Sequence, residues 1–184
     1  MQRYISNIIL NAIYRPQPYN YCSIQSLRTV YKVLNYAEIS IDEILHKSGV
    51  DHETVIKGRV GNKLMSQIAE FIGFRLEIVG SSSELFSWEQ IKTLIDTDTP
   101  MIFHREGHYC NICGYIEEPK MIKGELSYVP LGSTEISAWI VLAEHRVKGK
   151  TGIDDGMIEL FSLEKFKQEL DKNPNTALLI PYRL

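Results

Sequence analysis

Apolar residues recur at helical spacing in the first half of the chain. After Cys22 they fall on one helical face as far as about residue 36: Ile24, Leu27, Val30, Tyr31 and Leu34. The preceding residues, 14–21, contain two prolines and an asparagine, which indicates an ordered loop. Asn20 is the expected N-cap of the helix. That cap would place Cys22 in the first helical turn.

Three further helices are predicted before residue 100. The first is expected to start at Ser40 and stop at Gly49, and the second to start at Gly61 and stop at Gly73. The third is expected to start at Ser87 and end before Pro100. The first of them also has Glu43 three residues after its N-cap, which is the spacing of a capping box. Residues 50–61 lack such a pattern and are expected to form a loop.

The second half of the chain reads mainly as strands. Stretches rich in β-branched and aromatic residues occur at 75–79, 101–104, 108–116, 137–147 and 176–182. One more helix is expected at about 162–170, just before the last strand. Helices followed by a mostly antiparallel sheet indicate the α+β class. We expect a single domain over residues 1–184, with an inserted arm at about 117–136.

Composition narrows the possible partners and location. The chain of 184 residues has a formal net charge of -3, and its 20 lysines and arginines are scattered. This distribution predicts no nucleic-acid partner. No apolar stretch approaches the roughly 20 residues of a membrane span, and no secretory signal is recognised. The three cysteines form no disulfide framework, so we expect a cytoplasmic protein. Export as an effector or toxin without a cleavable signal is the alternative.

Cys22 is the candidate nucleophile. A cysteine in a first helical turn lies near unpaired N–H groups and the positive end of the helix dipole, which stabilise the thiolate. The alternative is an inert buried cysteine, since free cysteines are among the most buried residues. Taken alone, the pattern around Cys22 favours the inert buried cysteine.

Two other residue types would complete a nucleophilic site. His108 follows a glycine at the start of a predicted strand and is the candidate base for Cys22. His104, at the end of the preceding strand, is its competitor. Gln17 lies on the loop before the helix, where its side-chain amide could share an oxyanion with the Cys22 N–H.

Cys110 and Cys113 have the spacing of zinc knuckles and redox dithiols. Both lie in a predicted strand, where Cys110 shares a face with His108 and Cys113 points to the opposite face. Two ligands on opposite faces cannot hold one metal ion, and the chain has no second cysteine pair. We therefore expect no metal site and no cofactor.

Several stretches together resemble the papain-like cysteine peptidases. They are Gln17 followed by "YCSIQSLRTVYKVLNY" and "ISIDEIL", then "LMSQIAEFIGFRLEIV", "TPMIFHREGHYCNICGYI" and "LFSLEKFKQEL". The resemblance runs from about Pro16 to Pro181, apart from the arm, and is strongest to the bacteriocin-processing (double-glycine leader) peptidases and their stand-alone relatives. Phytochelatin synthases are also similar. It implies a papain-like fold, with Cys22 as nucleophile, His108 as base and Gln17 as oxyanion donor.

The chain departs from this family at two positions. Ser23 stands where many relatives have a glycine directly after the cysteine. The family's third catalytic residue is an Asp or Asn at the end of the next strand, which orients the imidazole. Here Glu144 occupies that position, and Asp154 and Asp155, in a glycine-flanked turn, are the alternatives.

The resemblance implies a cysteine peptidase that cleaves a peptide or isopeptide bond through a thioester on Cys22. The expected partner is a peptide or protein substrate. One alternative is an acyl or peptidyl transferase of the phytochelatin-synthase type, which shares the nucleophile but passes the acyl group to another acceptor. Another is a catalytically inactive peptidase-like binding module, for which Cys22 would keep an ordinary thiol pKa.

Overall fold

A computed structural model describes residues 2–14, 20–80, 87–105, 107–119, 136–143, 158–172 and 175–184. The elements in these residues are, in chain order, β1 (Gln2–Ile5), α1 (Asn7–Ala12), α2 (Cys22–Asn35), α3 (Ile41–Ser48), α4 (His52–Ile56), α5 (Asn62–Phe71), β2 (Phe74–Val79), α6 (Trp88–Asp96), β3 (Ile102–Arg105), β4 (His108–Pro119), β5 (Ile136–Ala143), β6 (Ile158–Ser162), α7 (Leu163–Lys172) and β7 (Ala177–Arg183).

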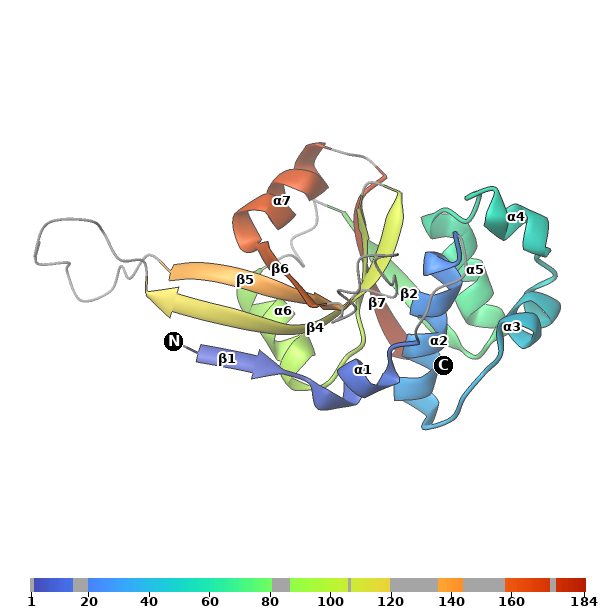
Figure 1. The fold of residues 1–184 in the computed structure, drawn as a ribbon, viewed down its shortest axis with the longest axis horizontal. Helices are drawn as coiled ribbons and strands as arrows, with labels where there is room; N and C mark the ends of the chain where they lie inside the picture. The colour runs from blue at the N-terminus through green and yellow to red at the C-terminus, as the bar shows by residue number, and fades with distance from the viewer. Residues whose placement is uncertain are drawn as a thin grey trace, which may run out of the picture.

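The strands form one antiparallel sheet in the order β2-β7-β3-β4-β5-β6, and β1 also pairs with β4. Helices α2 to α5 gather on one side of it, and α6 and α7 lie on the other (Figure 1). The predicted α+β class is therefore confirmed. Among the described helices, none is long and apolar enough to cross a membrane.

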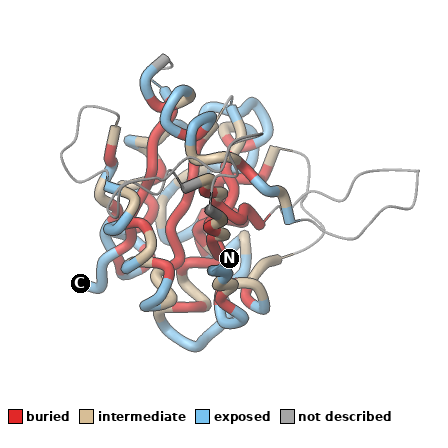
Figure 2. Tube along the Cα trace, turned by 90° about the vertical axis from the view of Figure 1, so that its left-hand side faces the viewer, coloured by how far each residue is buried: buried red, intermediate tan, exposed pale blue. Residues whose placement is uncertain are grey.

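The two faces of the sheet bury two different clusters. Ile102 and Tyr109 belong to the cluster formed with α2, α3 and α5, whereas their neighbours Phe103 and Cys110 belong to the cluster formed with α6 and α7. This alternation is the consequence of side chains pointing to opposite faces at successive strand positions. The sheet thus lies between two helical layers, and buried residues run through its centre (Figure 2).

Helix α2 is fixed by the apolar face that its sequence predicts. Ile24, Leu27 and Val30 are completely buried, and full burial of one such side chain is worth roughly 1.5–3 kcal/mol. The helix ends at Tyr36, which adopts a left-handed conformation (φ 51°). Its N-cap is Tyr21 rather than Asn20, and no side chain caps it.

The prediction of Asn20 as N-cap was wrong because this residue is used differently. It has a positive φ of 59°, and its Nδ2 donates to the Ile56 carbonyl at 2.6 Å. Asparagine tolerates the left-handed region better than most residues. Asn20 therefore connects the approach to α2 with the end of α4. Cys22 still begins the helix, as expected.

Other differences from the prediction concern short elements. The expected loop at 50–61 contains α4, whose N-cap Asp51 accepts a hydrogen bond from the Thr54 N–H at 2.6 Å. The elements β1, α1 and β6 were not predicted. The ends of the expected arm at 117–136 belong to β4 and β5, and residues 120–135 lie outside the described residues.

Candidate active site

The site is built where the first turn of α2 meets the start of β4. Cys22 is the first residue of α2, so it lies among N–H groups that no helical carbonyl can satisfy. His108 is the first residue of β4 and is paired with Arg105 across the β3–β4 turn. Gly107, with a φ of 73°, supplies the left-handed conformation that this tight turn requires.

The environment of Cys22 favours its thiolate. Burial raises the pKa of this thiol, but a hydrogen bond to the His108 side chain, the charge of His108 and the backbone N–H groups of Tyr109 and Ser23 together lower it below its ordinary value. Strand β4 thus supplies the His108 side chain and the Tyr109 N–H, and helix α2 supplies the Ser23 N–H. This arrangement, a cysteine sulfur hydrogen-bonded to an imidazole, favours the thiolate form of Cys22.

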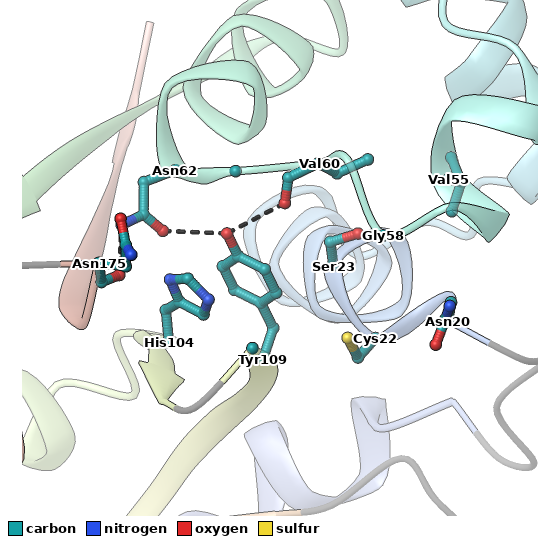
Figure 3. A pocket seen from close by; sticks show the side chains of 12 residues that line it. Asn20, Cys22, Ser23, Val55, Gly58, Val60, Asn62, His104, Tyr109 and Asn175 are labelled. Atoms are coloured by element: carbon teal, nitrogen blue, oxygen red, sulfur yellow. Dashed lines mark hydrogen bonds between the residues drawn. The ribbon is translucent and has the colours of Figure 1, made fainter. Parts of the chain in front are cut away.

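The structure distinguishes between the two candidate histidines. His104 pairs with Tyr109 across β3 and β4, and their rings stack at 4.0 Å with an interplanar angle of 8°. In Figure 3 it lies on the far side of Tyr109 from Cys22. Burial lowers the pKa of His104, the Asn175 backbone carbonyl opposes this, and the charge of His108 lowers it further. His104 is thus a neutral, buried ring, and His108 is the imidazole that contacts the sulfur.

A cavity of about 360 Å³ opens beside the sulfur (Figure 3). The residues lining it come from the start of α2, the segment 55–62, the β3–β4 hairpin and the approach to β7: Asn20, Cys22, Ser23, Val55, Gly58, Val60, Gly61, Asn62, His104, Gly107, Tyr109 and Asn175. Its volume is near the lower end of the range for ligand pockets, roughly 300–1,000 Å³. It has room for one amino-acid side chain next to the Cys22 sulfur.

Tyr109 connects the two walls of this cavity. Its hydroxyl lies 3.2 Å from the Val60 carbonyl and 3.0 Å from Asn62 Oδ1, and it can donate to either. Asn62 in turn donates from Nδ2 to the Asn175 carbonyl at 3.0 Å. Burial strongly raises the pKa of Tyr109, so the phenol stays protonated as the donor that these contacts need. The hairpin that bears His108 is therefore tied to the segment opposite it.

A second set of contacts holds the residues directly before Cys22. The Tyr21 hydroxyl lies 2.5 Å from His52 Nδ1, and His52 Nε2 lies 3.2 Å from an Asp42 carboxylate oxygen. Because a carboxylate only accepts, His52 Nε2 donates to Asp42, and the second hydrogen bond joins Nδ1 to the Tyr21 hydroxyl. With the Asn20–Ile56 hydrogen bond, this network anchors the start of α2 to α3 and α4.

The remaining predicted site residues cannot be placed. Gln17, Glu144, Asp154 and Asp155 lie outside the described residues. Conversely, sequence reasoning missed Tyr109, Asn62 and Asn175 as cavity residues. The only available signals were the place of Tyr109 next to His108 and the place of Asn62 directly after the glycine that opens α5.

Cys110 and Cys113 take no part in this site. Cys110 is buried with the cluster near α6 and α7, and Cys113 is buried against α1 and β5. Their sulfurs contact different backbone carbonyls, Phe103 at 3.6 Å and Val141 at 3.5 Å. In the described part of the chain, no group of three or more His, Cys, Asp or Glu side chains could hold a metal ion.

The comparisons with known proteins add no further assignment. No protein-family model matches the chain, and no curated protein is similar to it in sequence. Conclusions about its activity therefore rest on the residues and on the geometry of the site.

Proposed function

We propose that this chain is a papain-like cysteine hydrolase that cleaves a peptide or isopeptide bond. The observation that carries the proposal is the contact between Cys22 and His108, together with the net lowering of the Cys22 pKa in spite of burial. An inert cysteine in an apolar site has a raised pKa instead. The cavity beside the sulfur provides room for a substrate group.

The residues supply each step of acyl transfer. The Cys22 thiolate attacks the carbonyl carbon and forms a C–S bond, and the Cys22 N–H, with Gln17 by the family resemblance, stabilises the oxyanion. The His108 imidazolium protonates the leaving amine as the C–N bond breaks. Neutral His108 then removes a proton from water, which attacks the thioester, releases the carboxylic acid and restores Cys22.

The pH dependence of alkylation tests the proposal without a known substrate. The rate of iodoacetamide labelling is measured at each cysteine by peptide mass spectrometry. Because the Cys22 pKa is lowered, its thiolate persists as the pH falls, so Cys22 should still label rapidly below about pH 7. Cys110 and Cys113, completely buried in the core, should label much more slowly. A Cys22 profile with a midpoint near ~8.5 would instead favour a binding module.

The identity of the third catalytic residue is a separate prediction. If Glu144 orients His108, Glu144→Gln should reduce turnover severely, by roughly 10²- to 10⁴-fold, because the amide no longer stabilises the imidazolium. The measurement is the rate of peptide cleavage for Glu144→Gln, Asp154→Asn and Asp155→Asn in parallel. Normal turnover in the first variant and loss in one of the others would assign the role to that aspartate.

A further inference from the structure

The cavity beside Cys22 is lined by side chains that the proposed cleavage does not use. Of its lining side chains, only Cys22 has a part in the proposed reaction. The other lining residues enclose a cavity that is large enough for one amino-acid side chain and lies directly beside the Cys22 sulfur. The chemical character of this lining determines which substrate groups can enter.

The lining excludes charged groups. Among the described residues around the cavity there is no Asp, Glu, Lys or Arg. His104, the one remaining titratable group besides Cys22 and the Tyr109 phenol, is kept neutral by burial. A carboxylate or ammonium group placed here would lose its hydration, and the charges nearest to it, those of Cys22 and His108, already offset each other, so such burial is strongly unfavourable.

The lining is not suited to an apolar group either. Ser23 lines the cavity and only 3% of it is exposed, and His104, which also lines it, has a buried Nδ1 that finds no hydrogen-bond partner among the described residues. The amide nitrogens of Asn20 and Asn62 are already committed to backbone carbonyls. An apolar substituent would therefore leave His104 Nδ1 unpaired and shielded from water, whereas a polar one can pair with it and with the Ser23 hydroxyl.

Two glycines provide the space on the opposite wall. A Cβ atom added at Gly58 or Gly61 would meet no atom within 4 Å. Gly58 has a positive φ of 65°, so a side chain there is strained, but Gly61 has an ordinary φ of -85°. Position 61 can therefore carry a larger residue that reduces the room in the cavity without distorting the backbone.

We propose that this cavity is a substrate subsite for an uncharged, hydrogen-bonding side chain, a carboxamide above all, with Ser23 as its specificity-determining residue. A carboxamide offers both a donor and an acceptor, and the Ser23 hydroxyl can pair with either. It also fills more of the cavity than a hydroxyl group does. The inference rests on the proposed function, because the subsite selects substrates for attack by Cys22.

Chloroacetyl probes test this preference. The N-chloroacetyl derivatives of glutamine amide, glutamate amide and methionine amide have side chains of similar length but differ in charge and hydrogen bonding. In each case the Cys22 sulfur forms a C–S bond to the chloroacetyl carbon and chloride leaves. Labelling rates at Cys22 are measured by mass spectrometry and divided by the iodoacetamide rate of the same variant, which removes differences in thiolate content.

In the unmodified protein the glutamine probe should react about tenfold faster than the other two, the size expected for one buried hydrogen bond. Ser23→Ala should reduce the ratio of the glutamine to the methionine rate to near one. Ser48→Ala, a serine of α3 outside the cavity, should keep the original ratio. Gly61→Leu should slow all three probes relative to iodoacetamide.

Equal rates for the three probes, or a faster methionine or glutamate probe, would overturn the inference about the subsite. The proposed function would still stand in that case if iodoacetamide labels Cys22 rapidly below about pH 7. An unchanged glutamine preference in Ser23→Ala would also overturn the inference about the subsite, since Ser23 would then not be the selecting group. If iodoacetamide labels Cys22 only as an ordinary thiol, both proposals fail together.

Discussion

Cys22→Ala should abolish turnover while leaving the protein folded. Removal of the nucleophile from a Cys–His site leaves no group that can form the thioester, and comparable deletions lower kcat by about 10⁴- to 10⁶-fold. The measurement is the appearance of new peptide termini, detected by mass spectrometry, when the protein is incubated with a synthetic peptide library. Circular dichroism and the Tm should remain close to those of the unmodified protein.

Cys113→Ala is the matched control for this substitution. Its sulfur is also buried, but it lies against α1 and β5 and does not line the cavity. We expect Cys113→Ala to retain turnover, with at most a modest loss of stability from the small volume removed. Turnover in Cys22→Ala equal to that in Cys113→Ala would mean that the cleavage does not pass through Cys22.

The features that sequence predicted well are those set by neighbouring residues. The apolar spacing after Cys22 identified α2 because burial of one helical face requires that period. Ser40 and Gly49 marked both ends of α3, since N-cap and C-cap geometry depends on local hydrogen bonds and on a positive φ. The start of a strand at His108, directly after Gly107, was likewise predicted and is the start of β4.

The features that sequence did not predict depend on contacts between distant residues. Asn20 satisfies every local rule for an N-cap, but its amide donates instead to Ile56, 36 positions away. Tyr109 joins the segment at 60–62 through its hydroxyl, and no periodicity predicts such a partner. The sequence named His108 ahead of His104, but the contact of His108 with Cys22 depends on the packing of α2 against β4, which no local pattern describes.

The charge state of Cys22 results from opposing contributions. Burial alone favours the neutral thiol, as it does in any site of low polarity. The lowered pKa therefore depends on His108 and on two backbone N–H groups that are available only because a helix begins and a strand starts at the same place. Removing the side-chain contribution should reverse the sign of the shift, which makes His108 the most informative second position.

His108→Ala should convert Cys22 into a slow-reacting thiol. Loss of the imidazole removes both its hydrogen bond and its charge, so burial dominates and the Cys22 pKa rises to its ordinary value or above. Alkylation at about pH 6 should then fall by at least ~10-fold, since each unit of pKa reduces the thiolate fraction tenfold below the pKa, and alkaline pH should restore it. Peptide turnover should be lost over the whole pH range, because no group remains to protonate the leaving amine.

The matched control is His46→Ala, which removes an exposed histidine in the last turn of α3. It should leave both the alkylation profile and turnover unchanged. The two readouts separate the roles of the imidazole: a restored alkylation rate at high pH without restored turnover assigns His108 both the ion pair and the proton transfer. If His108→Ala still labels rapidly at about pH 6, the backbone N–H groups of Ser23 and Tyr109 suffice to hold the thiolate, and His108 acts in proton transfer alone.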